Sequence, residues 1–129
     1  GNHRVAVASY RRAVRLDPDA PWYRHNLGHL MDVALNDAQG ALRHLEAAQK
    51  LAPPDADIAS SYAHCLARLG KLERAAEFAY TAVTIDPRNA DHRRLLVWIE
   101  AGAPAEYEVT NKDLERLNDE LSMSRTVRD

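Results

Sequence analysis

Proline recurs at a fixed interval in this chain, each time at the end of a similar segment. The segments cover residues 13–18, 48–53 and 82–87, and their prolines lie 35 and 34 residues apart. Each segment begins with alanine and carries a large aliphatic residue two positions before the proline. A period of this length indicates an architecture built from copies of one supersecondary unit, each of which buries its apolar face on the next.

The residues before each proline keep the same register. Spacings of four and three residues place them on one face of a helix, and the small side chains among them allow a neighbouring helix to approach closely. Proline then ends each helix, because it lacks an amide donor and clashes with the preceding turn. The matching positions are Ala6, Tyr10 and Ala13 before Pro18, Ala41, Leu45 and Ala48 before Pro53, and Ala75, Ala79 and Ala82 before Pro87.

A second group of helices is predicted between these. Each is marked by a pair of residues that begins nine positions after a proline, namely Leu27-Gly28, Tyr62-Ala63 and Leu96-Val97. Turn residues at 36–37 and 70–71 separate the two helices of the second and third hairpins. The sequence therefore predicts an all-α chain with helices over residues 3–16, 20–35, 38–51, 56–69, 72–85, 90–101 and 111–123.

This pattern resembles the tetratricopeptide repeat (TPR), a 34-residue helix–turn–helix unit with a signature of small residues and proline. The resemblance covers about residues 6–101. It departs from the signature at Gly40, which lies at a helix start, at Ala79, which replaces an aromatic residue, and in the last hairpin, which keeps only its first helix. The resemblance implies an α-solenoid, a TPR-like superhelix of about three stacked antiparallel hairpins.

The repeat region is expected to span residues 1–103, with partial units at both ends. Because the chain begins in the second helix of a repeat, it is either a segment of a longer array, which we favour, or a protein with an atypical first helix. The remaining residues, 104–129, are predicted to form a loop, a capping helix and a frayed tail. The expected repeat units cover residues 1–20, 21–54, 55–88 and 89–103.

A last helix is predicted after the break at residues 102–104. Thr110 and Asp113 resemble a capping pair at its start, and Leu114, Leu117 and Leu121 form an apolar stripe at helical spacing. We expect this helix to cover the exposed end of the last hairpin. The alternatives are that it docks on a partner or folds back over the groove of the solenoid.

Composition excludes several classes of function. A formal net charge of −2 gives no reason to expect nucleic acid or an anionic membrane as partner, and no apolar run is long enough to span a bilayer. The single cysteine, Cys65, is expected to face inward as a small apolar residue and fits a cytoplasmic location. No phosphate-binding loop, dinucleotide motif or nucleophile motif is present, so we expect no enzyme activity and no cofactor.

The resemblance implies a binding groove along the first helix of each repeat. The side chains expected there are polar, with an indole at either end, and could donate hydrogen bonds to a carboxylate or to an extended peptide backbone. The two tryptophans could instead pack between hairpins or under the last helix. Only Arg94 matches the cations of the chaperone-binding clamp found in some members. The expected groove residues are Trp22, His25, Asn26, His29, Asp32, Ser60, His64, Arg68, Arg94 and Trp98, with Val33, Asp57, Ser61, Ala67, Asp91, Leu95 and Ala101 beside them.

Histidines in the groove raise a second possibility. His25 and His29 are four residues apart, a spacing that can present two imidazoles to one metal, and His64 and Asp32 could join them. Solvent-facing groove histidines are commoner, so we expect no metal site. Such a groove could hold anionic ligands more tightly as the pH falls. His3, His44 and His92 are expected on the surface.

The sequence thus predicts a module that binds a peptide or a partner protein. Two alternatives stay open. The chain could be a regulatory or scaffold segment of a larger enzyme, or it could form a homo-oligomer through an apolar edge of its first helix that includes Val5, Val7 and Val14.

Overall fold

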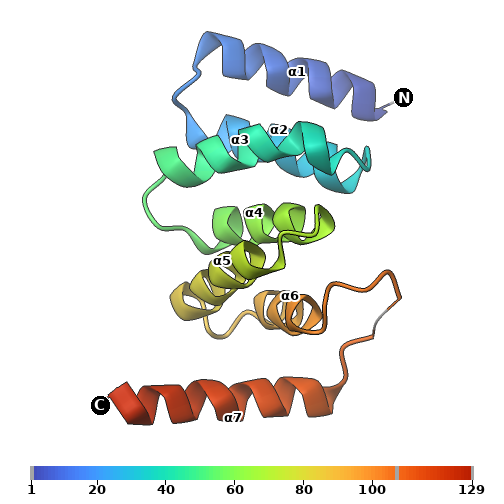
Figure 1. Ribbon diagram of the computed structural model, residues 1–129. Helices are drawn as coiled ribbons and strands as arrows, with labels where there is room; N and C mark the ends of the chain where they lie inside the picture. Colours follow the sequence, from blue (N-terminus) through green and yellow to red (C-terminus); the bar gives the residue numbers. More distant parts are fainter. Residues whose placement is uncertain (1, 107, 129) are drawn as a thin grey trace.

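The structure, a computed structural model, describes residues 2–106 and 108–128, with side chains described as far as residue 123. Within these ranges it contains seven helices and no strand. The helices follow one another along a single stack, with the two ends of the chain at opposite ends of it (Figure 1). They are α1 (Asn2–Leu16), α2 (Pro21–Val33), α3 (Ala38–Leu51), α4 (Ala56–Arg68), α5 (Leu72–Ile85), α6 (Ala90–Glu100) and α7 (Asn111–Arg128).

The repeat register predicted the first six helices to within two residues at each end. The exception is α7, which was expected to end at residue 123 but continues to Arg128. No glycine or proline lies within it to stop the helix, and the frayed tail from residue 124 stays a prediction. The side chains of that tail lie outside the described residues.

Side-chain caps define where several helices begin. Asp37 accepts a hydrogen bond from the amide of Gly40 at 2.9 Å, and Asp55 accepts one from Ile58 at the same distance. The cap explains the unusual glycine near the start of α3, because a Cβ at Gly40 would lie 2.3 Å from Asp37 Oδ2. Helix α4 ends at the turn around Gly70, whose φ of +78° suits glycine.

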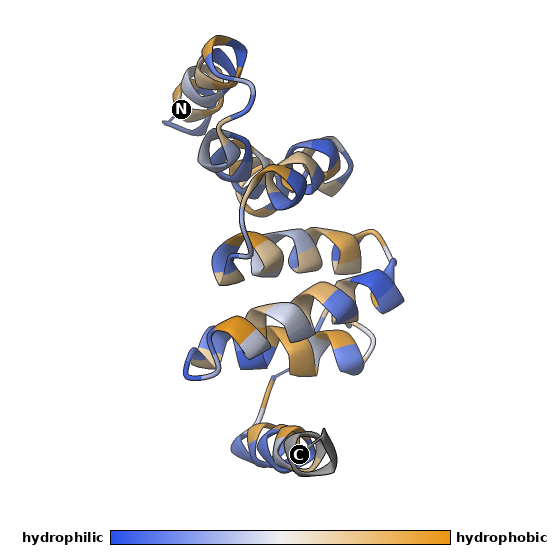
Figure 2. Cartoon of the chain, turned by 90° about the vertical axis from the view of Figure 1, so that its left-hand side faces the viewer, coloured by the Kyte–Doolittle hydropathy of each residue, from blue (hydrophilic) through white to orange (hydrophobic). Residues whose placement is uncertain are grey.

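The helices pack in chain order around one main hydrophobic core, beside a small second cluster between α4 and α5. Helix α2 pairs with α3 and α4 with α5, and the second helix of each hairpin then contacts the first helix of the next. Hydrophobic and hydrophilic residues occur together on the helices in Figure 2, as expected for helices that bury one face. The largest fully buried side chains are Tyr62, Leu27, Leu45, Ile58 and Leu66.

Three buried residues occupy the same position in successive repeats. Gly28 lies where α2 crosses α3, and a Cβ added there would lie 2.6 Å from Leu45 Cγ. One repeat later the position holds Ala63, and in the third it holds Val97, both of them buried. The close approach of α2 and α3 therefore depends on the absence of a side chain at Gly28.

Helix α1 packs against α2 and closes the first end of the stack. Val7 and Val14 are both buried in the shared core, so the predicted apolar edge was wrong at these two positions. Val5, in contrast, is 68% exposed. Helical spacing explains this difference in exposure. Val7 and Val14 are seven residues apart and share one face of α1, whereas Val5 lies well away from that face.

Helix α7 packs against α6 at the other end of the stack. Leu117 is buried in the common core, and Leu114 and Leu121 are partly buried against it, as the predicted stripe requires. Thr110 and Asp113 form a reciprocal cap, with the Thr110 amide donating to Asp113 Oδ2 and the Asp113 amide to Thr110 Oγ1. Of the described helices, none combines the length and the apolar character needed to cross a membrane.

Candidate functional site

The first helices of the three repeats, α2, α4 and α6, form one side of the stack. Helix α2 contacts α4, and α4 contacts α6. All ten predicted groove residues lie on these three helices. Contacts between repeats join most of these side chains into two groups. One of the groups borders a pair of cavities.

The first group is centred on Asp32, which is only 1% exposed. Its carboxylate accepts a hydrogen bond from His64 Nδ1 at 2.6 Å and lies 3.2 Å from Arg68 Nη1. Arg68 also donates to the main-chain oxygen of Asp32. Asp32 was expected to offer its carboxylate to a ligand, but the structure uses it to hold α2 against α4. A sequence cannot reveal this pairing, because the partners lie 32 and 36 residues away.

The second group is centred on Ser61, between two histidines of α2. Ser61 Oγ lies 2.8 Å from His25 Nε2 and 3.5 Å from His29 Nδ1. The amide oxygen of Asn26 lies 3.1 Å from His25 Nδ1, so this nitrogen donates and Nε2 accepts from the serine hydroxyl. His25 is buried, against the expectation of a solvent-facing side chain, whereas His29 is exposed.

The two histidines stack with ring centroids 5.7 Å apart. Partial desolvation of its ring by the surrounding protein lowers the pKa of His29, and the neighbouring His25 lowers it further. His25 is engaged by Ser61 and His64 by Asp32, so their imidazoles do not converge on one point. No three His, Cys, Asp or Glu side chains among the described residues are placed to hold a metal ion.

The two tryptophans differ in their surroundings. Trp22 is 45% exposed and meets His25 edge-on, with ring centroids 5.2 Å apart. Trp98 is partly buried, stacks on His64 with centroids 5.6 Å apart, and donates from Nε1 to the carbonyl oxygen of Pro104 at 3.0 Å. Trp98 is therefore fixed by the loop that follows α6 and still presents part of its surface to the groove.

Two neighbouring cavities share the His64–Trp98 pair. The larger cavity has a volume of about 510 Å³. Besides the shared pair, its lining is apolar except for Arg68. The smaller, of about 300 Å³, adds Arg94 and Asp91, which form an ion pair at 3.4 Å. The additional lining of the larger cavity comes from Val33, Ala67, Ala103, Pro104 and Ala105, and that of the smaller from Leu95 and Val109. The loop after α6 was not predicted to take part, because loop conformation has no repeat register.

Two predicted groove residues, Arg94 and Ser60, take little part in these contacts between repeats. Arg94 is largely exposed and borders only the smaller cavity, where Asp91 is its partner. Ser60 is half-buried, and no side-chain hydrogen bond to it is found within the described part of the chain, whereas its neighbour Ser61 makes two contacts. The hydroxyl that connects the repeats is therefore that of Ser61.

The other three histidines were all expected on the surface, and this prediction was wrong for two of them. His3 is exposed as predicted, but His44 and His92 are both buried. His92 Nε2 lies 3.4 Å from Asp57 Oδ1 without hydrogen-bond geometry. His44 shares the inward face of α3 with Ala41, Leu45 and Ala48, a spacing that could have predicted its burial.

Cys65 is fully buried in the core, as expected. Its thiol donates to the carbonyl oxygen of Ala38 at 3.2 Å. Burial, together with the nearby carboxylate of Asp32, raises the pKa of Cys65 to about 12. The thiolate that nucleophilic chemistry requires is therefore suppressed at neutral pH.

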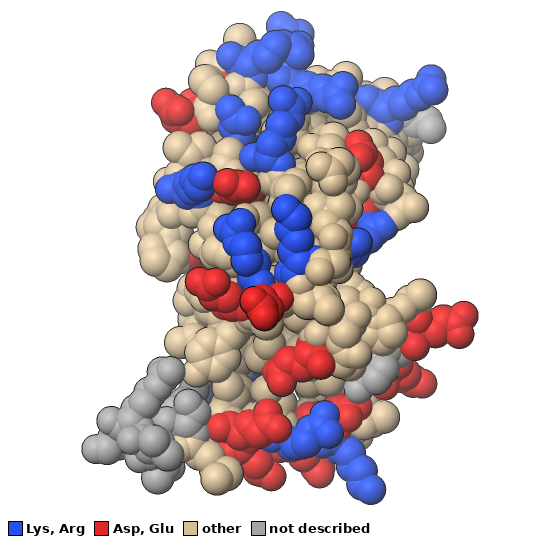
Figure 3. Space-filling model, in the orientation of Figure 1, with Lys and Arg blue, Asp and Glu red and all other residues tan. Residues whose placement is uncertain are grey.

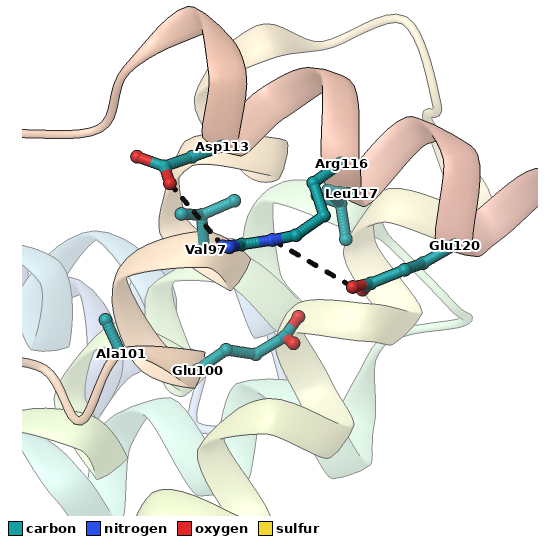
Figure 4. Close-up of a pocket in the computed structure, with 7 residues that line it drawn as sticks. All are labelled: Val97, Glu100, Ala101, Asp113, Arg116, Leu117 and Glu120. Atoms are coloured by element: carbon teal, nitrogen blue, oxygen red, sulfur yellow. Dashed lines mark hydrogen bonds and ion pairs between the residues drawn. The ribbon is translucent and has the colours of Figure 1, made fainter.

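A further cavity of about 320 Å³ lies at the end of the stack, between α6 and α7. Arg116 lies between Asp113, at 3.5 Å, and Glu120, at 4.0 Å, and Glu100 extends from α6 into the same gap (Figure 4). Burial raises the pKa of Glu100, and Glu120 raises it further. This cavity is separated from the groove by α6, and its one cation, Arg116, is held between two of the carboxylates that line it.

The fold and its groove define an α-solenoid of helical repeats, and the comparisons give its family. The sequence pattern of the TPR repeat matches residues 1–31, and that of the tetratricopeptide repeat matches residues 32–99, more than half of the chain. The chain belongs to the tetratricopeptide repeat family. Members of this family generally act as protein-interaction modules without enzyme activity. No curated protein matches the sequence significantly.

Two solved structures have similar folds. One is described as the MamA RS-1 ArsTM double mutant, and the other as MamA 41-end from Desulfovibrio magneticus RS-1. Each gives a TM-score of 0.75 at 20% sequence identity, over 98% of this chain and 68% of the MamA chain. At this identity the likeness establishes the fold and carries no information about the ligand.

Proposed function

We propose that this chain binds an extended segment of a partner protein across the groove formed by α2, α4 and α6, centred on the His64–Trp98 pair. The observation that carries the proposal is the pair of cavities on either side of these stacked rings. An indole fixed by a hydrogen bond loses little conformational freedom on binding, which favours its use as an interface anchor.

The chemistry of the cavities favours a particular kind of segment. Val33, Trp98 and Pro104 offer an apolar surface for one side chain, in a cavity where Arg68 is the cation. Arg94 borders the other cavity and is less firmly held, because its ion pair with Asp91 is solvent-exposed. A segment with an apolar side chain next to an acidic one would match both cavities, with its carboxylate at Arg94.

The test is selection from a random peptide library, followed by titration of the selected peptides. Trp22→Phe leaves Trp98 as the single indole, so that fluorescence reports on the groove. We expect Val33→Glu and Arg94→Ala each to weaken binding at least tenfold. The matched control is Arg12→Ala, which removes the same charge from the exposed surface of α1.

Circular dichroism must show that each variant keeps its helical content. Equal affinity of the wild type and Val33→Glu for every selected peptide would exclude this groove as the binding surface. Loss of binding in Arg12→Ala alone would place the interaction at α1 instead.

A further inference from the structure

A cleft lies between α1 and α3, with α2 as its floor. Its volume is about 260 Å³, and seven side chains line it: Arg11, Val14 and Arg15 from α1, Arg24 and Leu27 from α2, and Arg43 and His44 from α3. Arg24 and Leu27 lie on a face of α2 roughly opposite that of His25 and His29, so the cleft and the groove are separate sites. Lys and Arg side chains gather over this end of the molecule, above α1 and α3, and Asp and Glu gather near α7 (Figure 3).

The four arginines of the cleft bring an uncompensated positive charge together. None of them forms an ion pair with a carboxylate of the described residues, whereas Arg68, Arg94 and Arg116 elsewhere in the chain all do. Helix α1 contains four arginines and no acidic residue. Arg24 donates from Nε to the carbonyl oxygen of Pro18 at 3.1 Å, which fixes the start of its guanidinium and leaves its terminal nitrogens available.

His44 gives an independent sign of the same positive potential. It is only 6% exposed, and its Nδ1 is buried without a hydrogen-bond partner within the described residues. Burial, together with the nearby charges of Arg43, Arg24 and Arg11, lowers the pKa of His44 to about 4. The imidazole is therefore neutral at physiological pH, and the charge of the cleft comes from the arginines.

Convergence of like charges around a concave site costs free energy unless an anion occupies it. We propose that this cleft binds a phosphate dianion, either free or as a phosphate monoester on a partner. Guanidinium groups match the oxygens of a phosphate through paired hydrogen bonds. Four guanidinium groups offer more hydrogen-bond donors than the two oxygens of a single carboxylate can accept. The cleft is smaller than the about 300–1,000 Å³ typical of sites for drug-sized ligands, which suits one phosphate group rather than a nucleotide.

Calorimetric titration of the whole chain in phosphate-free buffer at constant ionic strength tests the proposal. The probes are inorganic phosphate and a short phosphoserine peptide, with chloride and the unphosphorylated peptide as references. We expect phosphate to bind and Arg43→Gln or Arg11→Gln to weaken it at least tenfold, while Arg12→Gln, on the same helix but outside the cleft, leaves the affinity within twofold. Tighter binding of the phosphopeptide assigns the site to a modified partner, and equal binding assigns it to the free ion.

A second measurement identifies the site directly. The His44 ring signals are followed by NMR as the pH is changed, and bound phosphate should raise the pKa of this histidine by opposing the arginine charges. The proposal is overturned if neither phosphate probe binds better than its reference, or if Arg12→Gln weakens binding as much as Arg43→Gln. It is also overturned if saturating phosphate leaves the His44 pKa unchanged. None of these results depends on whether a peptide binds in the groove.

Discussion

Asp32 of α2 and His64 of α4 meet at 2.6 Å across the junction between two repeats, although both were expected to face a ligand in the groove. The buried carboxylate also holds Arg68, so three polar side chains connect two helices through one acceptor group. His64 in turn stacks on Trp98 of α6. The residues that line the groove are thus also the residues that fix the repeats relative to one another.

Removing the carboxylate should destabilise this junction. We expect Asp32→Ala to lower the free energy of unfolding by about 2–3 kcal/mol, because His64 and Arg68 lose their shared acceptor but keep some access to water. Urea denaturation measures the loss. The control is Asp91→Asn, whose exposed ion pair should contribute less than about 0.5 kcal/mol. Equal losses in the two variants would contradict a structural role for Asp32.

The close packing at Gly28 predicts an unusual response to alanine. In most helix positions the change from glycine to alanine stabilises by about 1 kcal/mol. Here the new Cβ would lie 2.6 Å from Leu45 Cγ, so we expect Gly28→Ala to lower the melting temperature, with a net loss of about 1–3 kcal/mol. Adding Leu45→Val should recover part of this loss by making room. A stabilised Gly28→Ala variant would show that the two helices can separate freely.

The buried imidazole of His44 predicts a loss of stability in acid. Its folded pKa of about 4 lies below the unfolded value of 6.5, so the unfolded chain binds more protons between these pH values. Stability should therefore fall as the pH is lowered from 6.5 to 4, by up to about 3 kcal/mol from this group.

Chemical denaturation of the wild type and His44→Gln at a series of pH values isolates the contribution. His29 has a lowered pKa as well and is retained in both proteins, so the difference between them reports on His44. Parallel curves for the two proteins would refute the prediction.

Cys65 should be protected from thiol reagents. Its pKa of about 12 and its complete burial leave almost no reactive thiolate, so labelling with a disulfide reagent at pH 8 should follow the rate of unfolding. A matched control is Ser9→Cys in a Cys65→Ala background, which places a thiol on the exposed surface of α1 and should react at once. Rapid stoichiometric labelling of folded wild-type protein would count against the buried position.

The helices could be predicted because each repeat applies the same local rules. The positions of Pro18, Pro53 and Pro87 give the helix ends, and the small residues before them give the packed faces. The groove was predicted at the level of helices but not of individual contacts. Asp32 and His64 pair across repeats, and nothing within either helix indicates the distance between them.

Two further errors came from judging residues by polarity alone. His44 and His92 were expected on the surface, although His44 is spaced with Ala41 and Leu45, and His92 with Leu96, as parts of buried faces. The basic cleft was missed for a different reason. Its arginines come from three helices and share no motif, so only the absence of acidic residues in the first helix could have pointed to it.

The graded position occupied by Gly28, Ala63 and Val97 has a consequence for how a ligand can lie along the stack. The side chain at this position grows from none to a methyl and then to an isopropyl group, so successive repeats are not identical at this buried point. A polypeptide displaced by one repeat would therefore lie on a unit that is packed differently from the one before. We therefore expect a segment bound in the proposed groove to take one register and one direction.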